Sequence, residues 1–439
     1  MAQAQPAETG RASRAEARRK AKGKAKGIAV GKDRLWQRLM ELGTIGAQSG
    51  GGVTRFSFTA EERRAKDLVI GYMKEAGLAV REDAAGNVIG RREGGDPFAP
   101  VVMTGSHLDT VPQGGKFDGA LGVLAAIEAL QQMNEAGVAT RHPIEVAVFT
   151  DEEGARFGFG MLGSRAMAGT LRAEDLTAHR DECGLTIAQA MTQAGLDPAR
   201  IGEAARRPGE IRAYVELHIE QATVLERHNL PVGVVSGIAG PLWLQFRLRG
   251  EAGHAGATPM CGRRDPLAAA ARILTHIYDE TRNFPNAVAT VGKIHAFPGG
   301  INVIPGEVAF TLDVRDIDEA ARNALESRLL SRAEEICGAH GIDLEVAELQ
   351  RVAPAPCAPE LMAAIEQACR KLGHAPLVLP SGAGHDGMQL VRLCPIGMIF
   401  VRSRNGISHS PEEWTSPEDC FAGASVLYHT LLALAEGRA

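Results

Sequence analysis

Several short motifs of this chain place imidazole and carboxylate side chains where they could bind metal ions. The histidines are His107, His218 and His409, and the acids stand in Phe117-Asp118-Gly119 and Asp151-Glu152-Glu153-Gly154. Each motif follows an apolar run or contains glycine. Nitrogen and oxygen donors of this kind suit divalent transition-metal ions. The pattern therefore predicts a hydrolase that uses two metal ions.

The spacing within these motifs suggests how the roles could be divided. His107 precedes Asp109 by two residues, so the carboxylate could accept a hydrogen bond from one ring nitrogen and leave the other for metal. Glu152 and Glu153 are adjacent and point apart, so one could bind metal while the other takes a proton from water. Taken singly, Asp118 could equally cap a helix, and the acidic pair could be a solvated turn.

The segments around these motifs predict an α/β fold. Residues 100–104 and 144–149 have the apolar character of buried strands, and residues 119–133 between them that of a helix. This order predicts a mixed, mostly parallel sheet with helices on both faces. Ligands gather at the carboxyl ends of such strands, where His107 and the Glu152-Glu153 pair stand. Residues 215–220 alternate strictly, which places Glu216, His218 and Glu220 on one face.

The length of 439 residues favours more than one domain. Residues 230–352 contain none of the metal-type motifs, and their pattern predicts a βαββαβ unit with strands at 242–248, 287–294, 307–314 and 344–349 and helices at 266–281 and 319–338. We therefore expect an inserted domain at 230–352, with a catalytic domain formed by 33–229 and 353–439.

Composition narrows the function classes. The net charge is −5, so a nucleic-acid partner is not expected, although residues 1–32 form a basic segment that we predict to be a disordered tail. No run has the length of a membrane span or the pattern of a signal peptide. The seven cysteines include no CxxC pair, which argues against disulfides and a cysteine zinc site. A cytoplasmic protein without a membrane partner is expected.

From about Leu35 to its end, the chain resembles the dinuclear metal amidohydrolases, a family that includes N-carbamoyl-L-amino acid hydrolase, allantoate amidohydrolase and a type of β-ureidopropionase. This family lies within the aminoacylase and carboxypeptidase group. The resemblance rests on six motifs: Gly105-Ser106-His107-Leu108-Asp109-Thr110, Asp151-Glu152-Glu153-Gly154, Glu216-Leu217-His218-Ile219-Glu220-Gln221, Gly253-His254-Ala255-Gly256, Ser381-Gly382-Ala383-Gly384-His385-Asp386 and Gly406-Ile407-Ser408-His409-Ser410-Pro411.

The resemblance implies two divalent cations per subunit, Zn²⁺, Mn²⁺ or Co²⁺, with Asp118 bridging them. It implies that Glu152 is the general base and that Asp109 supports His107. The 230–352 insert would pair two subunits and close over the site, and His254 would reach a neighbouring site to steady an oxyanion. The implied metal ligands are His107, Asp118, Glu153, His218 and His409, and the implied substrate-binding residues are Asn302 and Arg315 (a carboxylate clamp), Gln221 (the ureido group), Gly384 and His385.

The substrate is the least constrained point. Residues 235–241 and 404–409 look most like bacterial L-carbamoylases, so hydrolysis of N-carbamoyl-L-amino acids is the first expectation. Allantoate is the main rival, followed by β-ureidopropionate and N-acyl amino acids, because all carry a carboxylate. Ala155 and Gly387 depart from residues common in the family without removing a ligand. A nitrilase-like cysteine enzyme would need an activated thiol, and an inactive relative would lack a ligand or the base.

Overall fold

The computed structural model describes residues 31–437. The predicted basic tail lies outside these residues, apart from residues 31 and 32. The chain forms two compact units. The first unit contains the residues up to Val235, Cys357–Leu379 and the residues from His385 onward. The second contains Ser236–Pro356 and Pro380–Gly384. The main segment of the second unit begins and ends a few residues later than the insert predicted at 230–352.

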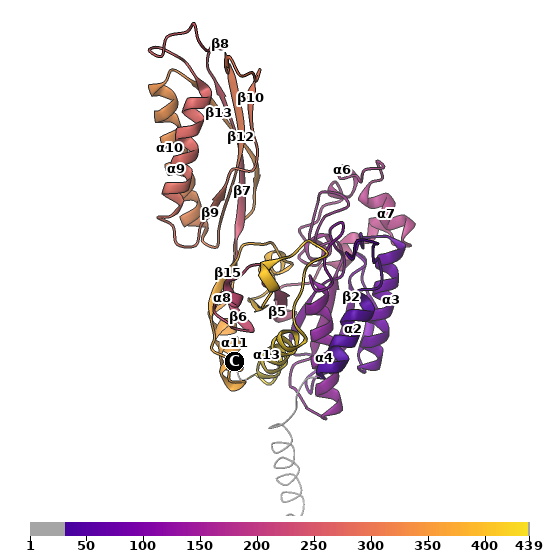
Figure 1. The fold of residues 1–439 in the computed structure, drawn as a ribbon. Coiled ribbons are helices and arrows are strands. Elements are labelled where there is room, and N and C mark those ends of the chain that lie inside the picture. Colours follow the sequence, from indigo (N-terminus) through magenta and orange to yellow (C-terminus); the bar gives the residue numbers. More distant parts are fainter. Residues whose placement is uncertain (1–30, 438–439) are drawn as a thin grey trace, which may run out of the picture. The chain divides into compact units, whose positions relative to one another are not determined.

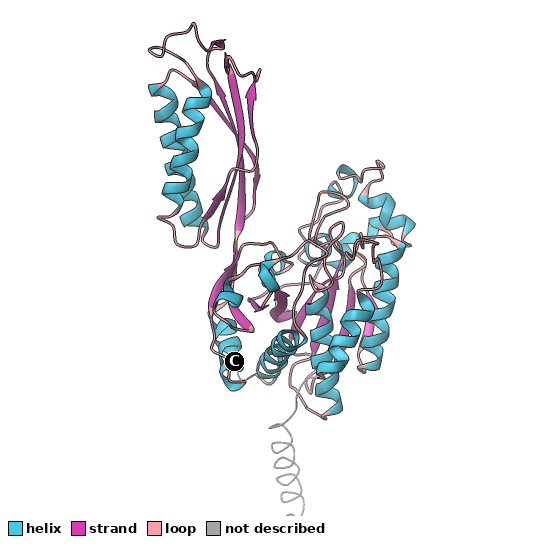
Figure 2. Ribbon diagram, in the orientation of Figure 1, coloured by secondary structure: helices cyan, strands magenta, loops and turns pink. Residues whose placement is uncertain are grey.

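A nine-stranded mixed sheet forms the framework of the first unit (Figures 1 and 2). Its four neighbouring central strands are parallel, and the strands on either side are antiparallel. The predicted mixed α/β sheet is therefore confirmed, with its parallel part confined to the centre. The strand order is β1 (Ala79–Glu82), β2 (Val88–Arg92), β4 (Ile144–Phe149), β3 (Val101–His107), β5 (Ile211–Ile219), β16 (Ile396–Val401), β6 (Val232–Ile238) and β14 (Ala355–Pro356), while β15 (Val378–Ser381) also pairs with β6.

Helices cover both faces of this sheet, as the sequence predicts. The long helices share one large apolar core with the sheet. On the opposite face, the short helix α5 (Leu162–Met167) contacts β4, and α12 (Gly387–Leu390) contacts β5 and β16. The long helices are α2 (Lys32–Leu42), α3 (Ala60–Glu75), α4 (Ala120–Glu135), α11 (Pro359–Lys371) and α13 (Pro417–Ala435), and the short ones are α5 (Leu162–Met167), α6 (Asp175–Ala178), α7 (Ile187–Gln193), η1 (Pro198–Ala204), α8 (Val224–Arg227), α12 (Gly387–Leu390) and η2 (Arg404–Gly406).

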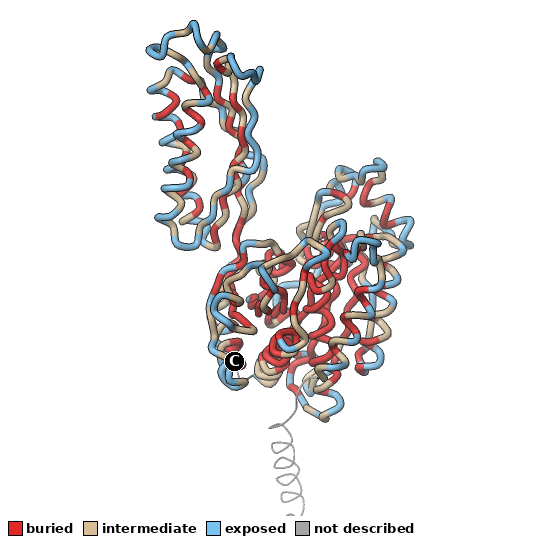
Figure 3. Tube along the Cα trace, in the orientation of Figure 1, coloured by how far each residue is buried: buried red, intermediate tan, exposed pale blue. Residues whose placement is uncertain are grey.

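The central strands are buried along their whole length, which explains their apolar sequences. Every residue of β3, β4 and β16 is buried, and the buried residues in Figure 3 concentrate on these strands and on the helices beside them. Helix α4 is apolar almost all round because α2, α13 and the sheet surround it. Its one buried acid, Glu128, is paired with Arg34 at 2.7 Å. Helix α4 is thus firmly fixed, and its N-terminus carries the Asp118 loop.

The second unit is a small antiparallel sheet with two helices on one face. The sheet order is β10-β12-β7-β13, and β9 also pairs with β12. The chain order agrees with the predicted βαββαβ pattern, except that the strand expected at 287–294 is broken into two short strands. The elements are β7 (Gly240–Arg249), β8 (Gly253–His254), α9 (Pro266–Thr281), β9 (Val288–Thr290), β10 (Ile294–Phe297), β11 (Val303–Ile304), β12 (Glu307–Asp316), α10 (Glu319–Ala339) and β13 (Asp343–Arg351).

Local signals account for these elements. Strand β12 alternates buried and half-buried residues, so that its apolar side chains face the helices. Helices α9 and α10 begin at Asp265 and Asp318, whose carboxylates accept hydrogen bonds from main-chain N–H groups of the first turn. No helix between residues 31 and 437 is long and apolar enough to cross a membrane.

Candidate active site

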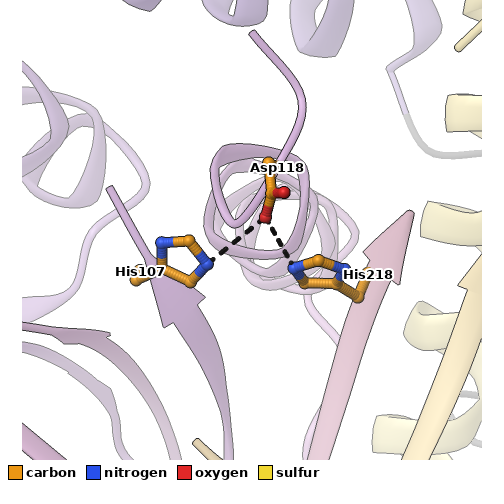
Figure 4. Close-up of side chains that lie close together, drawn as sticks. All are labelled: His107, Asp118 and His218. Carbon is orange, nitrogen blue, oxygen red and sulfur yellow. Dashed lines mark ion pairs between the residues drawn. The ribbon is translucent and has the colours of Figure 1, made fainter. Parts of the chain in front are cut away.

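Three of the predicted metal ligands meet at the carboxyl ends of central strands. His107 is the last residue of β3, His218 lies near the end of β5, and Asp118 immediately precedes the turn that starts α4. Asp118 Oδ1 lies 3.0 Å from His218 Nε2 and 3.5 Å from His107 Nε2 (Figure 4). All three side chains are buried. This first trio could hold one cation.

The other oxygen of Asp118 belongs to a second trio. Asp118 Oδ2 lies 3.5 Å from His409 Nε2, which in turn lies 3.5 Å from Glu153 Oε2. The three donor atoms lie within 4.8 Å of one another. Asp118 therefore presents one oxygen to each trio, which is the arrangement of a bridging carboxylate. The alternative in which Asp118 caps α4 fails, because Gly119 is the capping residue and no side chain caps this helix.

The main chain fixes the ring orientation of the two strand histidines. His107 Nδ1 lies 3.0 Å from the carbonyl oxygen of Asp109, and His218 Nδ1 lies 2.9 Å from the carbonyl oxygen of Ile219. Each Nδ1 therefore carries the hydrogen, and each Nε2 is left to face Asp118, where it could bind a metal ion. The predicted hydrogen bond from His107 to the carboxylate of Asp109 is not the one that forms, because that carboxylate lies 3.7 Å away.

The carboxylate of Asp109 instead holds the acidic turn. Its two oxygens accept hydrogen bonds from the main-chain N–H groups of Glu152 and Glu153, at 3.2 Å and 3.1 Å. Asp151 begins this turn with φ 55°, a left-handed conformation that non-glycine residues adopt at a cost. Asp109 thus links β3 to the turn after β4 and fixes where the two glutamates point.

Glu152 stands beside the first trio and is nearly buried. Its Oε2 lies 3.7 Å from His107 Nε2, and its side chain is 9% exposed. Burial, together with the nearby acids Asp386 and Glu153, raises the pKa of Glu152 well above its ordinary value despite the attraction of His107. Burial and Asp118 likewise raise the pKa of Glu153 to about 7. A bound cation would offset the repulsion that Glu152 and Glu153 each experience from neighbouring carboxylates.

The same neighbouring carboxylates also raise the pKa values of His107 and His409. Burial opposes the charged form of His107, but Glu152, Asp118 and Asp109 raise its pKa well above the ordinary value. The hydrogen bond with Asp118 raises the pKa of His409 to about 9. The buried acids therefore draw protons onto the histidines where no cation is bound. Three imidazoles and two carboxylates form a donor set that fits divalent transition metals.

Two further predicted residues adjoin this cluster. Gln221 Nε2 donates a hydrogen bond to Asp118 Oδ2 at 2.8 Å, while its buried Oε1 has no hydrogen-bond partner among the described residues. His385 is buried, and its ring packs edge-on against His218 with 4.4 Å between centroids. Burial and His218 hold the pKa of His385 well below its ordinary value. His385 is therefore a neutral neighbour of the first trio.

The remaining predicted residues belong to the second unit, where two of them are neighbours. His254 and Val303 are directly paired between β8 and β11, and the carbonyl oxygen of Asn302 accepts a hydrogen bond from Ala255 N at 3.0 Å. Both His254 and Asn302 are exposed. His254 Nδ1 accepts hydrogen bonds from two main-chain N–H groups at 3.1 Å. In the neutral ring Nε2 therefore carries the hydrogen and can donate it.

Arg315 lies on β12 in the five-stranded sheet, whereas His254 and Asn302 lie at the separate two-stranded sheet of β8 and β11. Arg315 is paired with Pro241, while Glu307 at the other end of β12 is paired with Arg249. Eight residues of strand correspond to roughly 26 Å. Arg315 and the pair of His254 and Asn302 are therefore far apart within one chain. The predicted clamp of Asn302 with Arg315 does not form within one insert.

The guanidinium of Arg315 is already partly engaged. Its Nε and Nη2 donate to the carboxylate of Asp313 at distances between 2.9 Å and 3.2 Å, and its Nη1 donates to Gly382 O at 2.7 Å. These bonds use three of its five N–H groups. One hydrogen on each terminal nitrogen remains for an incoming carboxylate. Gly384, half-buried, ends the same short loop as Gly382.

Three further residues that shape the cluster were given no role from the sequence. Glu413 accepts a hydrogen bond from Asp118 N, Ser408 Oγ lies 3.0 Å from Asp118 Oδ2, and Gly119 lies against the ring of His107. Ser408 stood in a quoted motif without a role. Glu413 stands four residues after His409, and only this proximity could have drawn attention to it.

The cysteine alternative finds no support in the described residues. Five of the seven cysteines are buried, and burial raises the pKa of every one of these thiols. A raised pKa disfavours the thiolate that would have to attack a substrate. The other two, Cys183 and Cys261, are exposed, and among the described residues neither belongs to the clusters of metal-type side chains around Asp118.

Comparisons with known proteins agree with this chemistry. Residues 103–433 match the model of the peptidase family M20/M25/M40. The N-carbamoyl-L-amino acid amidohydrolase of Geobacillus stearothermophilus is 60% identical over 92% of this chain and 99% of its own length. The allantoate amidohydrolase of Bacillus subtilis is 39% identical over 90% and 95%. A hydantoinase/carbamoylase family amidase from Burkholderia multivorans superposes with a TM-score of 0.88 at 37% identity, covering 93% of this chain and 99% of that one.

A glycine beside His107 provides a test of the cluster. A Cβ atom at Gly119 would lie 2.6 Å from three ring atoms of His107. We expect Gly119→Ala to displace the ring and weaken metal binding at least about tenfold, the lower range seen when groups that only orient a ligand are lost. The measurement is a competition titration of metal ions against a chromophoric chelator.

The matched control is Gly137→Ala, at the other end of α4. Gly119 and Gly137 have φ of 62° and 64°, so both substitutions place a side chain on a residue of positive φ, but a Cβ at Gly137 would meet no atom within 4 Å. Equal metal affinity in the two variants would show that the His107 ring is not part of a metal site.

Proposed function

The chain belongs to the peptidase family M20/M25/M40, and we propose that it hydrolyses the carbamoyl amide of N-carbamoyl-L-amino acids to the L-amino acid, ammonia and carbon dioxide. The observation that carries this proposal is the pair of ligand trios sharing Asp118, with Glu152 beside them. The higher identity to the carbamoyl amidohydrolase than to the allantoate amidohydrolase supports the choice of substrate.

We propose that two divalent cations, Zn²⁺, Mn²⁺ or Co²⁺, occupy the two trios. One would be held by His107, Asp118 and His218, and the other by Asp118, Glu153 and His409. When bound, such ions polarise a carbonyl group and acidify water. The donor set accepts all three metals, so the choice among them follows their availability.

Glu152 would act as the general base and then as the acid. Its carboxylate accepts a proton from the water that attacks the carbamoyl carbon, and it returns this proton to the nitrogen that leaves. Its backbone is fixed by Asp109, so its carboxylate is preorganised. The buried Gln221 Oε1, which lacks a partner among residues 31–437, is suited to accept an N–H of the ureido group. Gly384 and His385 would line the pocket.

Substrate binding would require two copies of the chain. Arg315 keeps two terminal hydrogens for the substrate carboxylate, while His254 and Asn302 stand at the separate two-stranded sheet of the insert. We propose that His254 and Asn302 serve the site of a second subunit, where His254 Nε2–H would donate to the developing oxyanion. The insert would then be both the dimerisation domain and a lid. The free cysteines support a reducing, cytoplasmic setting.

The first test is ammonia release by the metal-stripped protein after Mn²⁺, Co²⁺ or Zn²⁺ is restored. We expect metal-dependent hydrolysis of N-carbamoyl-L-methionine and none of its D-enantiomer. Preference for allantoate would replace the proposed substrate and keep the mechanism. Turnover that persists without metal would contradict the mechanism itself.

The role of Glu152 can be tested by Glu152→Gln. The amide keeps the shape but cannot accept the proton, so we expect kcat to fall by roughly 10²–10⁴. Metal content should stay unchanged, because Glu152 belongs to neither trio. Steady-state kinetics and metal analysis on the same sample check both points. Full activity of the variant would remove Glu152 from proton transfer.

The role of Arg315 can be tested by Arg315→Lys. An ammonium group cannot offer two parallel N–H groups, so we expect KM to rise roughly 10–100-fold, as for the loss of about 1.5–3 kcal/mol from a charged hydrogen bond, with a smaller change in kcat. The control is Arg249→Lys, on the same sheet face at the opposite end. An unchanged KM in Arg315→Lys would exclude Arg315 from carboxylate binding.

A further inference from the structure

We propose that Glu413 is a positioning residue that holds the Asp118 segment and the His409 loop together, so that the second trio loses its metal ion when Glu413 is removed. This inference rests on the proposed pair of metal ions, but not on the proposed substrate. Glu413 belongs to neither trio, and the residue is buried, with 4% of its surface exposed.

The carboxylate of Glu413 joins two segments that are far apart in the sequence. Its Oε1 accepts hydrogen bonds from the main-chain N–H groups of Phe117 and Asp118, at 2.9 Å and 3.1 Å. Its Oε2 accepts the hydroxyl hydrogen of Ser408 at 2.8 Å. One side chain therefore fixes the backbone of the bridging aspartate and the residue next to His409.

Ser408 completes a closed set of contacts around Asp118. Its Oγ lies 3.0 Å from Asp118 Oδ2, the oxygen that faces His409. Gln221 Nε2 approaches both of these atoms, at 2.8 Å from Asp118 Oδ2 and 3.3 Å from Ser408 Oγ. The oxygen that would serve the second metal ion is thus oriented by groups that Glu413 holds in place.

The His409 loop needs this support. The side chain of His409 is 50% exposed, and His409 has φ of 55°, a left-handed conformation that its surroundings must maintain. Trp414, next to Glu413, packs against Trp36 and Phe117 with ring centroids 5.4 Å and 5.7 Å apart. This packing keeps Glu413 over the Asp118 segment.

The backbone beneath Glu413 is shaped to receive it. A Cβ atom at Gly115 would lie 2.0 Å from Glu413 Cδ and from its Oε1. Gly115 has no positive φ, so its missing side chain, rather than its backbone conformation, is what admits the carboxylate. Substitution of Gly115 is therefore a way to displace the carboxylate without removing it.

The first trio shares Asp118 with the second, but its two histidines do not depend on Glu413. His107 and His218 lie on buried strands, and carbonyl oxygens of Asp109 and Ile219 orient their rings. Loss of Glu413 should therefore weaken the trio of Asp118, Glu153 and His409 more than the trio of the two strand histidines. This asymmetry separates positioning from a general loss of structure.

The experiment measures metal stoichiometry and stepwise affinity of the full chain by competition of Zn²⁺ with a chromophoric chelator. We expect the unmodified protein to bind two ions, and Glu413→Ala to keep the tighter one while the second binds roughly 10–100-fold more weakly. Glu413→Gln should rescue binding, because its carbonyl oxygen can accept from both N–H groups and its amide can donate to Ser408 Oγ. The matched control is Glu412→Ala, which removes an exposed acid from the same loop and should change nothing.

Thermal unfolding of the metal-free variants, recorded in parallel, shows which of them are folded. If Glu413→Ala does not fold, Gly115→Ala gives the same test, and we expect it to weaken the second ion likewise. Unchanged affinity for both ions in a folded Glu413→Ala protein would overturn the inference. Fewer than two ions in the unmodified protein would instead refute the proposed two-metal site, so the two failures are distinguishable.

Discussion

The cluster is governed by one constraint, which is that several buried carboxylates lie within a few ångströms of one another. Asp118, Glu152 and Glu153 are all buried or nearly so, and burial with mutual repulsion raises the pKa of both glutamates. Only Asp118, which faces three imidazoles, has its pKa held well below the ordinary value, although burial alone would raise it. Cations would relieve this repulsion better than protons, because they leave the carboxylates ionised and Glu152 free to accept a proton.

The acids on β5 and directly after it, Glu216 and Glu220, do not add to this cluster of carboxylates around Asp118. The sequence places Glu216, His218 and Glu220 on one face, but only His218 joins a trio with Asp118. Glu216 accepts hydrogen bonds from Ser106 and Tyr214 at 2.8 Å and 3.0 Å, and Glu220 accepts them from main-chain N–H groups at the start of α8. Both carboxylates accept hydrogen bonds within the protein, and Glu216 lies close to His218 and His385 rather than to Asp118.

The features that could be predicted from the sequence are those encoded within short segments of the chain. The residues of the two trios could be named from the sequence because they stand in short motifs, two of them at or near the carboxyl ends of parallel strands. Their role as metal ligands stays a prediction. The mixed α/β sheet and the family resemblance, which were also predicted from short segments, are confirmed. Glu413 could not be found, since its partners Phe117 and Asp118 are 296 and 295 residues away along the chain. The direction of the Asp109 carboxylate was also beyond reach, because it depends on the turn after another strand.

In the insert, the sequence did not reveal how far apart the strands place two residues that are close along the chain. Asn302 and Arg315 are close in sequence and were expected to form one clamp, yet β12 runs between them and separates them by its length. The pairing of β7 with β12 continues without a bulge from Gly240 to Arg249, so the separation cannot be shortened by local bending. If His254, Asn302 and Arg315 all act on one substrate, they must come from more than one chain. A site divided in this way would make catalysis depend on association, and would explain why exposed residues such as His254 occupy a glycine-containing strand end far from the junction of the insert.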